Sequence, residues 1–312
     1  MKILLAGSSG FIGSALTPFL TQQGYQVVRL VRSQDQLTDQ TAFWDPQGDD
    51  IDLQKLDRIG GDEGIKAVIN LAGEDMSKKR WTPEVKEVIR ESRIRSTKLL
   101  SETLAKLRLK PGLLVNASAV GIYGNRAAEV LDEDSRPGEG FLADLAKDWE
   151  AATYPAADAG IRVVRSRFGI VFSAKGGALK KLIGMAKIGG AAPWGEGAQY
   201  MSWIVIDDLL RAFKHVISTE SLSGPVNFVS TNPMKNVEFS HSMQYYFKAP
   251  LTLHIPAFIL RMVIGEIADE VLLTSQRVLP TKLTRTGFKF RYTQLEPALR
   301  YLTSEKLQPG EV

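Results

Sequence analysis

The chain has 312 residues, of which 44% are hydrophobic and 24% charged, and its formal net charge is +4. This length is enough to bury a full hydrophobic core, and the composition is ordinary for a globular protein. The absence of cysteine excludes disulfides, thiolate catalysis and thiolate metal ligation. Lysines and arginines are scattered rather than clustered, which argues against a nucleic-acid partner.

Metal binding and membrane association are both disfavoured by the sequence. The histidines, His215, His241 and His254, are too far apart to form a helical metal pair, so we expect no metal site. The apolar start, residues 1–7, is too short for a signal peptide, and no apolar run approaches the ~18 residues of a membrane span. We therefore expect a cytoplasmic protein with no membrane partner.

Over the first 170 residues, β-branched runs alternate with segments of helical periodicity, which predicts an α/β fold with a doubly wound parallel sheet. The predicted strands are Lys2–Ala6, Gln26–Val31, Ala67–Leu71, Leu113–Ser118 and Arg162–Arg167. The predicted helices are Ile12–Gln23, Pro83–Leu107 and Phe141–Ala157. Two later runs, Ser202–Ile206 and Val226–Val229, are candidates to rejoin this sheet.

After about residue 231 the pattern changes, because prolines punctuate two amphipathic segments, Ala257–Ala268 and Glu270–Leu279. These segments predict a small, mostly helical C-terminal part, with the apolar face of the first segment turned to the core. The last residues, 308–312, are expected to form a frayed tail.

A glycine-rich loop lies between the first predicted strand and the first predicted helix. Such a loop must turn sharply, bring backbone N–H groups to a pyrophosphate and pack the helix on the strand, and each demand excludes a Cβ. The helix N-terminus adds partial positive charge for the anion. We therefore predict dinucleotide binding by Gly7, Ser8, Ser9, Gly10, Phe11, Ile12 and Gly13.

The end of the second predicted strand distinguishes between two dinucleotides. An NAD site places a carboxylate there for the ribose 2′-hydroxyl, whereas this chain has Arg32 and no acid. A guanidinium suits a 2′-phosphate through a bidentate contact. The cofactor predicted from Arg32 is NADP(H); the alternative is a solvated surface arginine.

A second turn of small residues follows the third predicted strand, at the edge of the sheet where the ligand crevice of a doubly wound fold lies. Its predicted cofactor-binding residues are Leu71, Ala72, Gly73 and Glu74.

Three motifs in order resemble the extended short-chain dehydrogenase/reductases, the NAD-dependent epimerase/dehydratase-like class. They are Gly-x-x-Gly-Phe-Ile-Gly from Gly7, Asn-x-Ala-Gly from Asn70, and Ser-Ala-Val-Gly-Ile-Tyr-Gly from Ser118. A narrower match resembles the "epimerase family protein" subgroup, which has its own C-terminal domain. It rests on Trp81, Ser92-Arg93, Phe141-Leu-Ala, Trp149-Glu150, Gly176-Gly-Ala, Ser202-Trp-Ile and Ser275-Gln-Arg-Val-Leu-Pro280.

The resemblance implies a Rossmann domain that binds NADP(H), with Ser92 added to its cofactor-binding residues. It also implies a division of the chain: the Rossmann domain over 1–230, with part of the substrate side inserted near 174–201, a smaller C-terminal substrate-side domain over 231–305, and a tail over 306–312. The implied partner is a small-molecule substrate of unknown identity, and the oligomeric state stays open.

The catalytic residues of the larger class are only partly present. Ser118 matches the serine that polarises the substrate, although a hydroxyl that satisfies a strand-end backbone group is an equal alternative. None of the eight tyrosines has lysine four residues later, so the class's Tyr-x-x-x-Lys pair is absent. Tyr123 and Lys147 are possible replacements, although Lys147 is about 100° off the expected helix face. Glu150 is expected to pack or cap, and the Glu133-Asp134 pair to be solvated.

Two functions follow from this pattern. The first is an NADP(H)-dependent oxidoreductase or epimerase that acts on a small polar or sugar-like substrate, with Ser118 as its catalytic residue. The second is a catalytically inactive NADPH-binding sensor or regulatory protein, which the missing Tyr/Lys pair favours.

Overall fold

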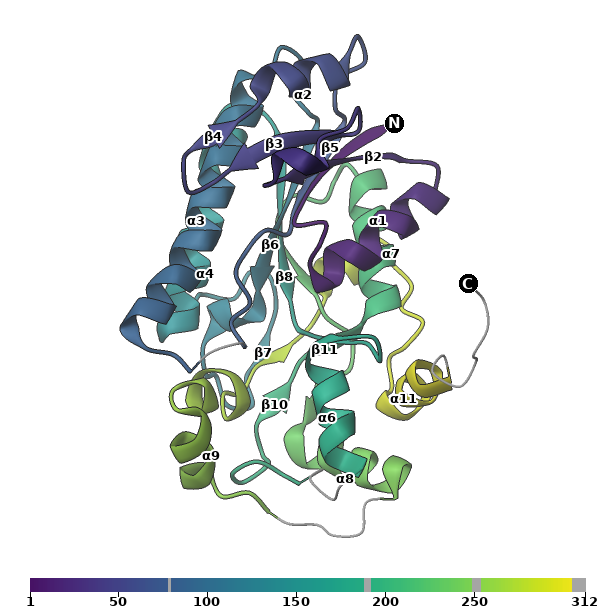
Figure 1. Cartoon of the computed structure of the whole chain (residues 1–312). Coiled ribbons are helices and arrows are strands. Elements are labelled where there is room, and N and C mark those ends of the chain that lie inside the picture. Colours follow the sequence, from purple (N-terminus) through teal and green to yellow (C-terminus); the bar gives the residue numbers. More distant parts are fainter. Residues whose placement is uncertain (78–79, 188–191, 249–253, 305–312) are drawn as a thin grey trace. The chain divides into compact units, whose positions relative to one another are not determined.

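The computed structural model describes residues 1–77, 80–187, 192–248 and 254–304 (Figure 1). The chain forms two compact units, each assembled from three separate stretches. The first unit comprises Met1–Ser118, Leu145–Ser166 and Phe213–Val226, and the second comprises the other described residues. The expected tail, 306–312, lies outside the described residues, and the division of function at residue 230 stays a prediction.

The central sheet has eight strands among the described residues, in the order β12-β8-β6-β5-β1-β2-β3-β4. Strand β1 lies between β2 and β5 and is parallel to both, and the β2–β3 and β5–β6 pairs are also parallel. The bounds are β1 Lys2–Ala6, β2 Gln26–Val31, β3 Thr41–Asp45, β4 Asp50–Ile51, β5 Ala67–Asn70, β6 Leu113–Ala119, β8 Arg162–Phe168 and β12 Gly224–Phe228. The doubly wound α/β fold is thus confirmed, with its change of direction between β1 and β5.

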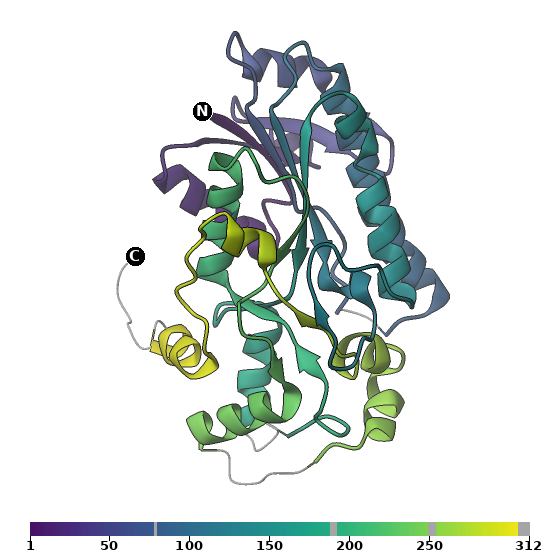
Figure 2. The ribbon, with the colours of Figure 1, turned by 180° about the vertical axis from the view of Figure 1, so that it is seen from behind.

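Helices cover both faces of this sheet, with α1 on one face and α3 on the other (Figures 1 and 2). Strands of such a sheet are buried on both sides, which is why Ile3–Ala6 is an uninterrupted apolar run with no exposed side chain. The helical elements that begin before residue 160 and lie wholly or partly in the first unit are α1 Phe11–Gln22, η1 Gln34–Gln36, α2 Leu53–Gly60, α3 Pro83–Lys106, α4 Phe141–Ala151 and α5 Tyr154–Asp158.

Most predicted elements before residue 170 agree with the structure within one residue at each end. The exception is the helix predicted over Phe141–Ala157, which is two helices, α4 and α5. Pro155 stands in the first turn of α5, where a proline is tolerated, but inside one continuous helix its ring would clash with the preceding turn. Strands β3 and β4 and helix α2 were not predicted.

The second unit contains, among the described residues, three small two-stranded sheets: β10–β13, β11–β9 and β14–β7. Its elements, including helix α7 that runs into the first unit, are η2 Val120–Tyr123, β7 Val130–Leu131, β9 Ile170–Phe172, α6 Gly177–Lys187, β10 Tyr200–Met201, β11 Trp203–Val205, α7 Ile206–Ser218, β13 Met234–Lys235, α8 Asn236–Phe247, α9 Ala257–Ile264, η3 Ala268–Leu272, β14 Arg277–Val278, α10 Thr281–Arg285 and α11 Leu295–Ser304. Of the two runs expected to rejoin the central sheet, Val226–Val229 does so as β12, whereas Ser202–Ile206 pairs with β9 instead.

The C-terminal helix predictions were only partly right. Helix α9 ends at Ile264, because Gly265 takes a φ of 67°, and its Phe258 and Met262 side chains are 66% and 67% exposed rather than turned to the core. The segment predicted as a helix over Glu270–Leu279 is instead the end of the short π-helix η3 followed by strand β14, which pairs with β7.

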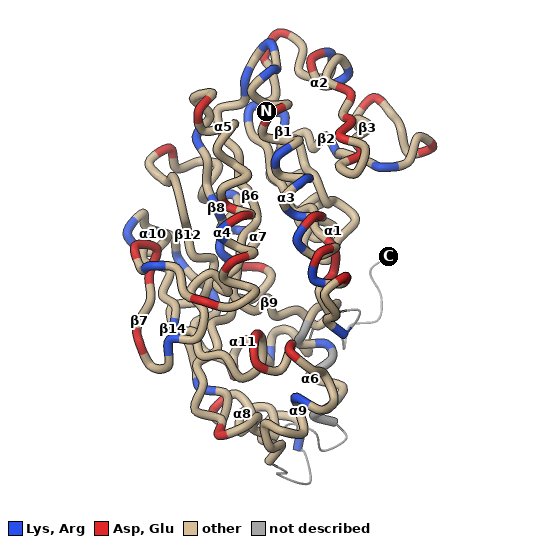
Figure 3. Tube along the Cα trace, turned by 90° about the vertical axis from the view of Figure 1, so that its left-hand side faces the viewer, with Lys and Arg blue, Asp and Glu red and all other residues tan. Residues whose placement is uncertain are grey.

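Charged residues of both signs are dispersed along the chain, as the composition suggested (Figure 3). Within the described ranges, no helix is both long enough and apolar enough to cross a membrane.

One carboxylate that was expected to be solvated is buried in the second unit. Glu133 is 4% exposed, and its Oε1 accepts hydrogen bonds from the backbone N–H groups of Asn227 (3.0 Å) and Lys282 (3.2 Å). Its Oε2 has no partner among the described residues. Burial raises the pKa of Glu133, and the two backbone donors oppose that shift. The side chain therefore joins β12 to α10, at the cost of an uncompensated oxygen.

Replacement of Glu133 tests this arrangement. Because its pKa in the folded state lies above the unfolded value of 4.5, folding favours the protonated form, and the stability gained from protonation is lost as pH rises through the folded pKa. We expect Glu133→Gln, in urea unfolding, to become progressively more stable relative to wild type as the pH rises from about 4.5 through the raised folded-state pKa of Glu133. Glu133→Ala leaves two buried N–H groups without acceptors, and should cost about 1–3 kcal/mol. A pH-independent difference between wild type and the Gln variant would contradict this account.

Candidate functional site

The glycine loop between β1 and α1 makes backbone contact with the loop that follows β5. Gly7 has a φ of 78°, and a Cβ there would lie 2.6 Å from the carbonyl carbon of Leu71. A Cβ at Gly13 would overlap the carbonyl oxygen of Gly7. At Gly10 the nearest atom would be 3.4 Å away, which is an ordinary contact. Two of the three glycines are thus required by the fold itself, and Gly10 is not.

Helix α1 begins without a capping side chain. Its N-cap residue is Gly10, and its first turn carries no acidic residue. The first N–H groups of a helix lack intrahelical acceptors and carry partial positive charge. Ser9 and Gly10 are exposed, so the end of the helix is open to a ligand. This arrangement suits an anion such as a pyrophosphate.

The second predicted loop, Leu71–Glu74, follows β5 at the same edge of the sheet. Asn70 shapes it from within, because its Oδ1 accepts a hydrogen bond from the N–H of Ala72 at 3.1 Å. The N–H of Glu74 donates to Oγ of Ser92, on α3, at 3.1 Å. The structure therefore brings Ser92 to this loop, although as a support for its backbone.

A buried polar network lies behind these loops. The side-chain amide of Asn70 donates to Asn116 Oδ1 (2.7 Å) and to Thr97 Oγ1 (3.0 Å), and the Trp149 indole N–H also donates to Thr97 (3.0 Å). Buried polar groups need such partners, so the network fixes how α3 and α4 sit against β5 and β6. Asn70 and Trp149 belong to motifs that the sequence singled out, whereas Thr97 and Asn116 do not.

Ser118 lies two residues after Asn116, at the carboxyl end of β6. Its hydroxyl donates to Oε1 of Glu150, on α4, at 2.7 Å, and the two residues are 1% and 5% exposed. The sequence presented Glu150 as a packing or capping residue, yet the structure gives its carboxylate direct contact with the candidate catalytic hydroxyl.

Arg93 is a residue of this region that sequence reasoning did not assign to the site. Its side chain lies on α3 against the loop after β5: a Cβ at Gly73 would be 3.2 Å from its Cγ. The residue is 8% exposed, and its guanidinium lies over the Trp149 ring, 5.2 Å from the centroid. Burial lowers the pKa of Arg93 to about 10, opposed by the charges of Glu74 and Asp75, so it is cationic at neutral pH.

Arg32 follows directly after β2, the strand beside β1. Its side chain is exposed, and no other described residue forms an ion pair or a hydrogen bond with its guanidinium. The glycine loop therefore has an available cation on its β2 side. In this fold, the ribose whose 2′ position distinguishes NAD from NADP lies on that side.

The segment in which the Tyr/Lys pair would lie offers apolar residues: Phe141 or Leu142 in place of the tyrosine, and Leu145 or Ala146 in place of the lysine. Leu142 is half-buried and its N–H donates to Glu270 at 3.1 Å; Ala146 is 2% exposed. Tyr123 is fully buried, accepts from Arg167 at 2.9 Å and donates to Asn227 at 2.8 Å. Burial raises the pKa of Tyr123 to about 12, which opposes a role as a proton shuttle. Lys147 is exposed on α4.

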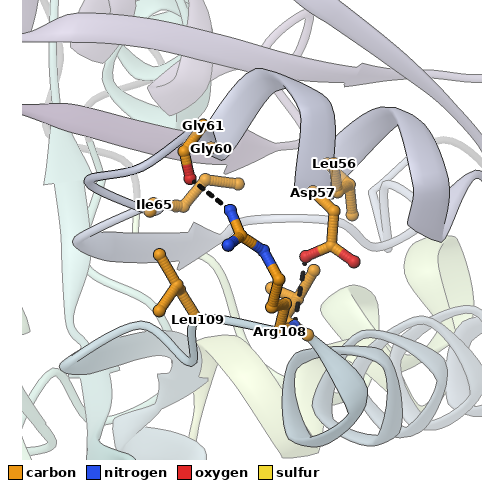
Figure 4. A pocket seen from close by; sticks show the side chains of 9 residues that line it. Leu56, Asp57, Gly60, Gly61, Ile65, Arg108 and Leu109 are labelled. Carbon is orange, nitrogen blue, oxygen red and sulfur yellow. Dashed lines mark hydrogen bonds between the residues drawn. The ribbon is translucent and has the colours of Figure 1, made fainter.

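Two pockets among the described residues differ in size and place. The pocket in Figure 4 has a volume of about 10 Å³, room for about one water. There Arg108 donates to Asp57 (3.1 Å) and to Gly61 (2.9 Å), at the amino ends of β5 and β6, the edge opposite the glycine loop. The other pocket, of about 310 Å³, lies within the second unit. Its lining includes Gly121, Glu139, Leu142, Asp269, Glu270 and Gln276.

Comparison with known families agrees with this geometry. Residues 3–228 match the model of the NAD dependent epimerase/dehydratase family, and residues 255–302 match a domain of unknown function, DUF1731. The chain therefore belongs to the NAD-dependent epimerase/dehydratase family. The resemblance inferred from the motifs is confirmed, including the separate C-terminal domain.

Individual relatives narrow the comparison. The chain is 40% identical over 308 residues to epimerase family protein Mb2239 of Mycobacterium bovis, covering 99% of this chain and 98% of the relative. It is 34% identical to epimerase family protein YfhF of Bacillus subtilis, covering 98% and 99%. The crystal structure of human epimerase family protein SDR39U1 (isoform 2) with NADPH superposes with a TM-score of 0.85 at 27% identity, covering 97% and 99%.

The backbone contact between the two loops predicts that alanine is tolerated better at Gly10 than at Gly13. Gly13→Ala must displace the backbone of the loop, so we expect a loss of about 1–3 kcal/mol or more in urea unfolding. Gly10→Ala, the matched control in the same loop, should cost no more than about 1 kcal/mol, the usual N-cap difference. Equal losses for the two variants would contradict the contact described here.

Proposed function

We propose that this protein is an NADP(H)-binding, epimerase-like oxidoreductase that acts on a small polar or sugar-like substrate. The observation that carries the cofactor assignment is Arg32: an exposed cation without a described partner stands after β2, where an NAD site has a carboxylate. The NADPH bound to the human relative supports the same choice. Phosphates would be held by the Gly7–Gly13 loop and by Arg32.

The nicotinamide ring would supply the hydride chemistry, and the protein must then handle a proton. We assign that task to Ser118 and Glu150, whose side chains are hydrogen-bonded at the sheet edge that carries the cofactor loops. In the oxidative direction a substrate hydroxyl gives its proton to Ser118 Oγ while Ser118 gives its own to Glu150 Oε1. The hydride would pass from the same substrate carbon to the oxidised nicotinamide of NADP⁺, so atoms and charge balance. Another proton route is necessary because apolar residues stand where the Tyr/Lys pair would lie.

A second function is favoured by one specific observation, the apolar side chains at positions 142 and 146. A protein that binds NADPH and signals without turnover needs no proton relay. In that case the Ser118–Glu150 hydrogen bond only anchors α4 to β6.

The cofactor assignment predicts a preference that depends on Arg32. By isothermal titration calorimetry, we expect NADPH to bind at least about tenfold tighter than NADH, a difference of about 1.4 kcal/mol. Arg32→Ala should abolish that preference by weakening NADPH alone. Arg29→Ala, an exposed arginine on the same strand, is the control and should leave it unchanged. Equal affinities for the two cofactors in wild type would refute the assignment.

The proton assignment is tested by turnover. Purified protein is incubated with a panel of aldehydes, ketones and nucleotide sugars while NADPH absorbance is followed. For any compound that reacts, Ser118→Ala and Glu150→Gln should lower kcat by about 100-fold or more with unchanged NADPH affinity. Lys147→Ala is the control and should keep full activity. Complete inertness of wild type beside tight NADPH binding would favour the sensor instead.

A further inference from the structure

The glycine loop contains no lysine or arginine, yet a pyrophosphate must lie against it if the proposed function is correct. Strand β1 is flanked by β2 on one side and β5 on the other, so the loops after those strands flank the glycine loop. The contact between Gly7 and Leu71 shows that the loop after β5 touches it directly. Arg32 stands on the β2 side, and among the described residues Arg93 is a cation on the β5 side.

The surroundings of Arg93 leave its charge incompletely compensated. A guanidinium has five N–H donors, and the one hydrogen bond formed by this side chain among the described residues is from NH1 to the carbonyl of Ile89, at 3.0 Å. Glu74 and Asp75 act on it through space, without a salt bridge to it in the described part of the chain. A cation that is 8% exposed normally has a carboxylate or several acceptors bonded to it.

The N–H groups of Arg93 that form no hydrogen bond in the described residues are not fully buried. The buried side-chain atoms that lack a partner in the described residues belong to Ser101, Glu133 and Arg165, and none belongs to Arg93. Its Nε and NH2 therefore have some access to solvent although most of the side chain does not. The Trp149 ring and the backbone at Gly73 confine the guanidinium, so little side-chain freedom would be lost when an anion binds.

We infer that Arg93 is an anion-binding residue of the cofactor site and that it neutralises the pyrophosphate of the dinucleotide. This inference rests on the proposed function. It gives the two anionic parts of NADP(H) separate cations: Arg32 for the 2′-phosphate and Arg93 for the pyrophosphate, on opposite sides of the glycine loop. The residue also distinguishes this chain from a site in which only backbone N–H groups meet the pyrophosphate.

The test compares two ligands that differ in the pyrophosphate. NADPH contains it, whereas adenosine 2′-monophosphate keeps the adenosine and the 2′-phosphate without it. We expect Arg93→Gln to weaken NADPH by about tenfold or more while adenosine 2′-monophosphate is affected by less than about twofold. Arg95→Gln, an exposed arginine two residues along α3, is the matched control and should change neither affinity. NADPH is measured by calorimetry and the nucleotide by NMR titration.

Salt dependence gives a second readout. Loss of a cation that contacts the pyrophosphate should make NADPH affinity less sensitive to ionic strength in Arg93→Gln than in wild type. If Arg93→Gln shows no cooperative transition in a thermal melt and is therefore unfolded, Arg93→Lys is used to test the inference. It keeps the charge but loses the planar fork, so it should weaken NADPH several-fold while leaving adenosine 2′-monophosphate unaffected.

The outcomes separate the two hypotheses. Wild-type protein that fails to bind NADPH overturns the proposed function and this inference with it. Wild type that binds NADPH, together with an Arg93→Gln variant of equal affinity, overturns the inference alone. An equal loss for both ligands also overturns it, because Arg93 would then only support the loop that contacts Gly7.

Discussion

The rest of the site depends on the backbone contact between the loop after β1 and the loop after β5. Adjacent parallel strands are about 4.8 Å apart, so the loops that leave their carboxyl ends compete for the same space. Here both loops fit because Gly7 and Gly13 have no Cβ. The chain can therefore turn into α1 immediately after β1. The N-terminus of α1 is thereby placed at the point where the sheet changes direction, beside the loop that Arg93 supports.

A second constraint is the set of buried polar groups below these loops. Asn70, Thr97, Asn116 and Trp149 satisfy one another, and leaving any one unpaired would cost about 1–3 kcal/mol. Few arrangements of α3 and α4 meet that requirement, so the network determines where the neighbouring residues of both helices lie. Glu150, next to Trp149, is brought to Ser118 in this way. The same fixed helices make the first unit suited to holding a ligand in one orientation.

The sequence predicted what depends on local pattern. Strand β1 is a continuous apolar run, the glycine spacing marks the loop, and the helical period of Pro83–Lys106 is long. Features that depend on distant partners were missed: β11 is a continuous apolar run like a strand of the central sheet, but its partner is the short β9. Arg93 could have been found, because Ile89, Arg93 and Thr97 are spaced four apart and share the buried face of α3. Its proximity to Gly73 could not, because it arises from tertiary packing.

The residues that stand in place of the family's Tyr/Lys pair are packed into the protein, and their packing limits the ways in which a reaction could proceed. Ala146 is 2% exposed, so a lysine there would bury an ammonium group, a costly change without a partner. Leu142 belongs to the second unit, where its N–H is bonded to Glu270 and its side chain lines the 310 Å³ pocket. One substitution at either position would therefore not restore the usual relay. The glycine loop and the loop after β5 do not involve either residue, so in the proposed function cofactor binding and proton transfer would depend on different side chains. In the function proposed above, the proton route would use groups that are already hydrogen-bonded at the sheet edge, as Ser118 and Glu150 are.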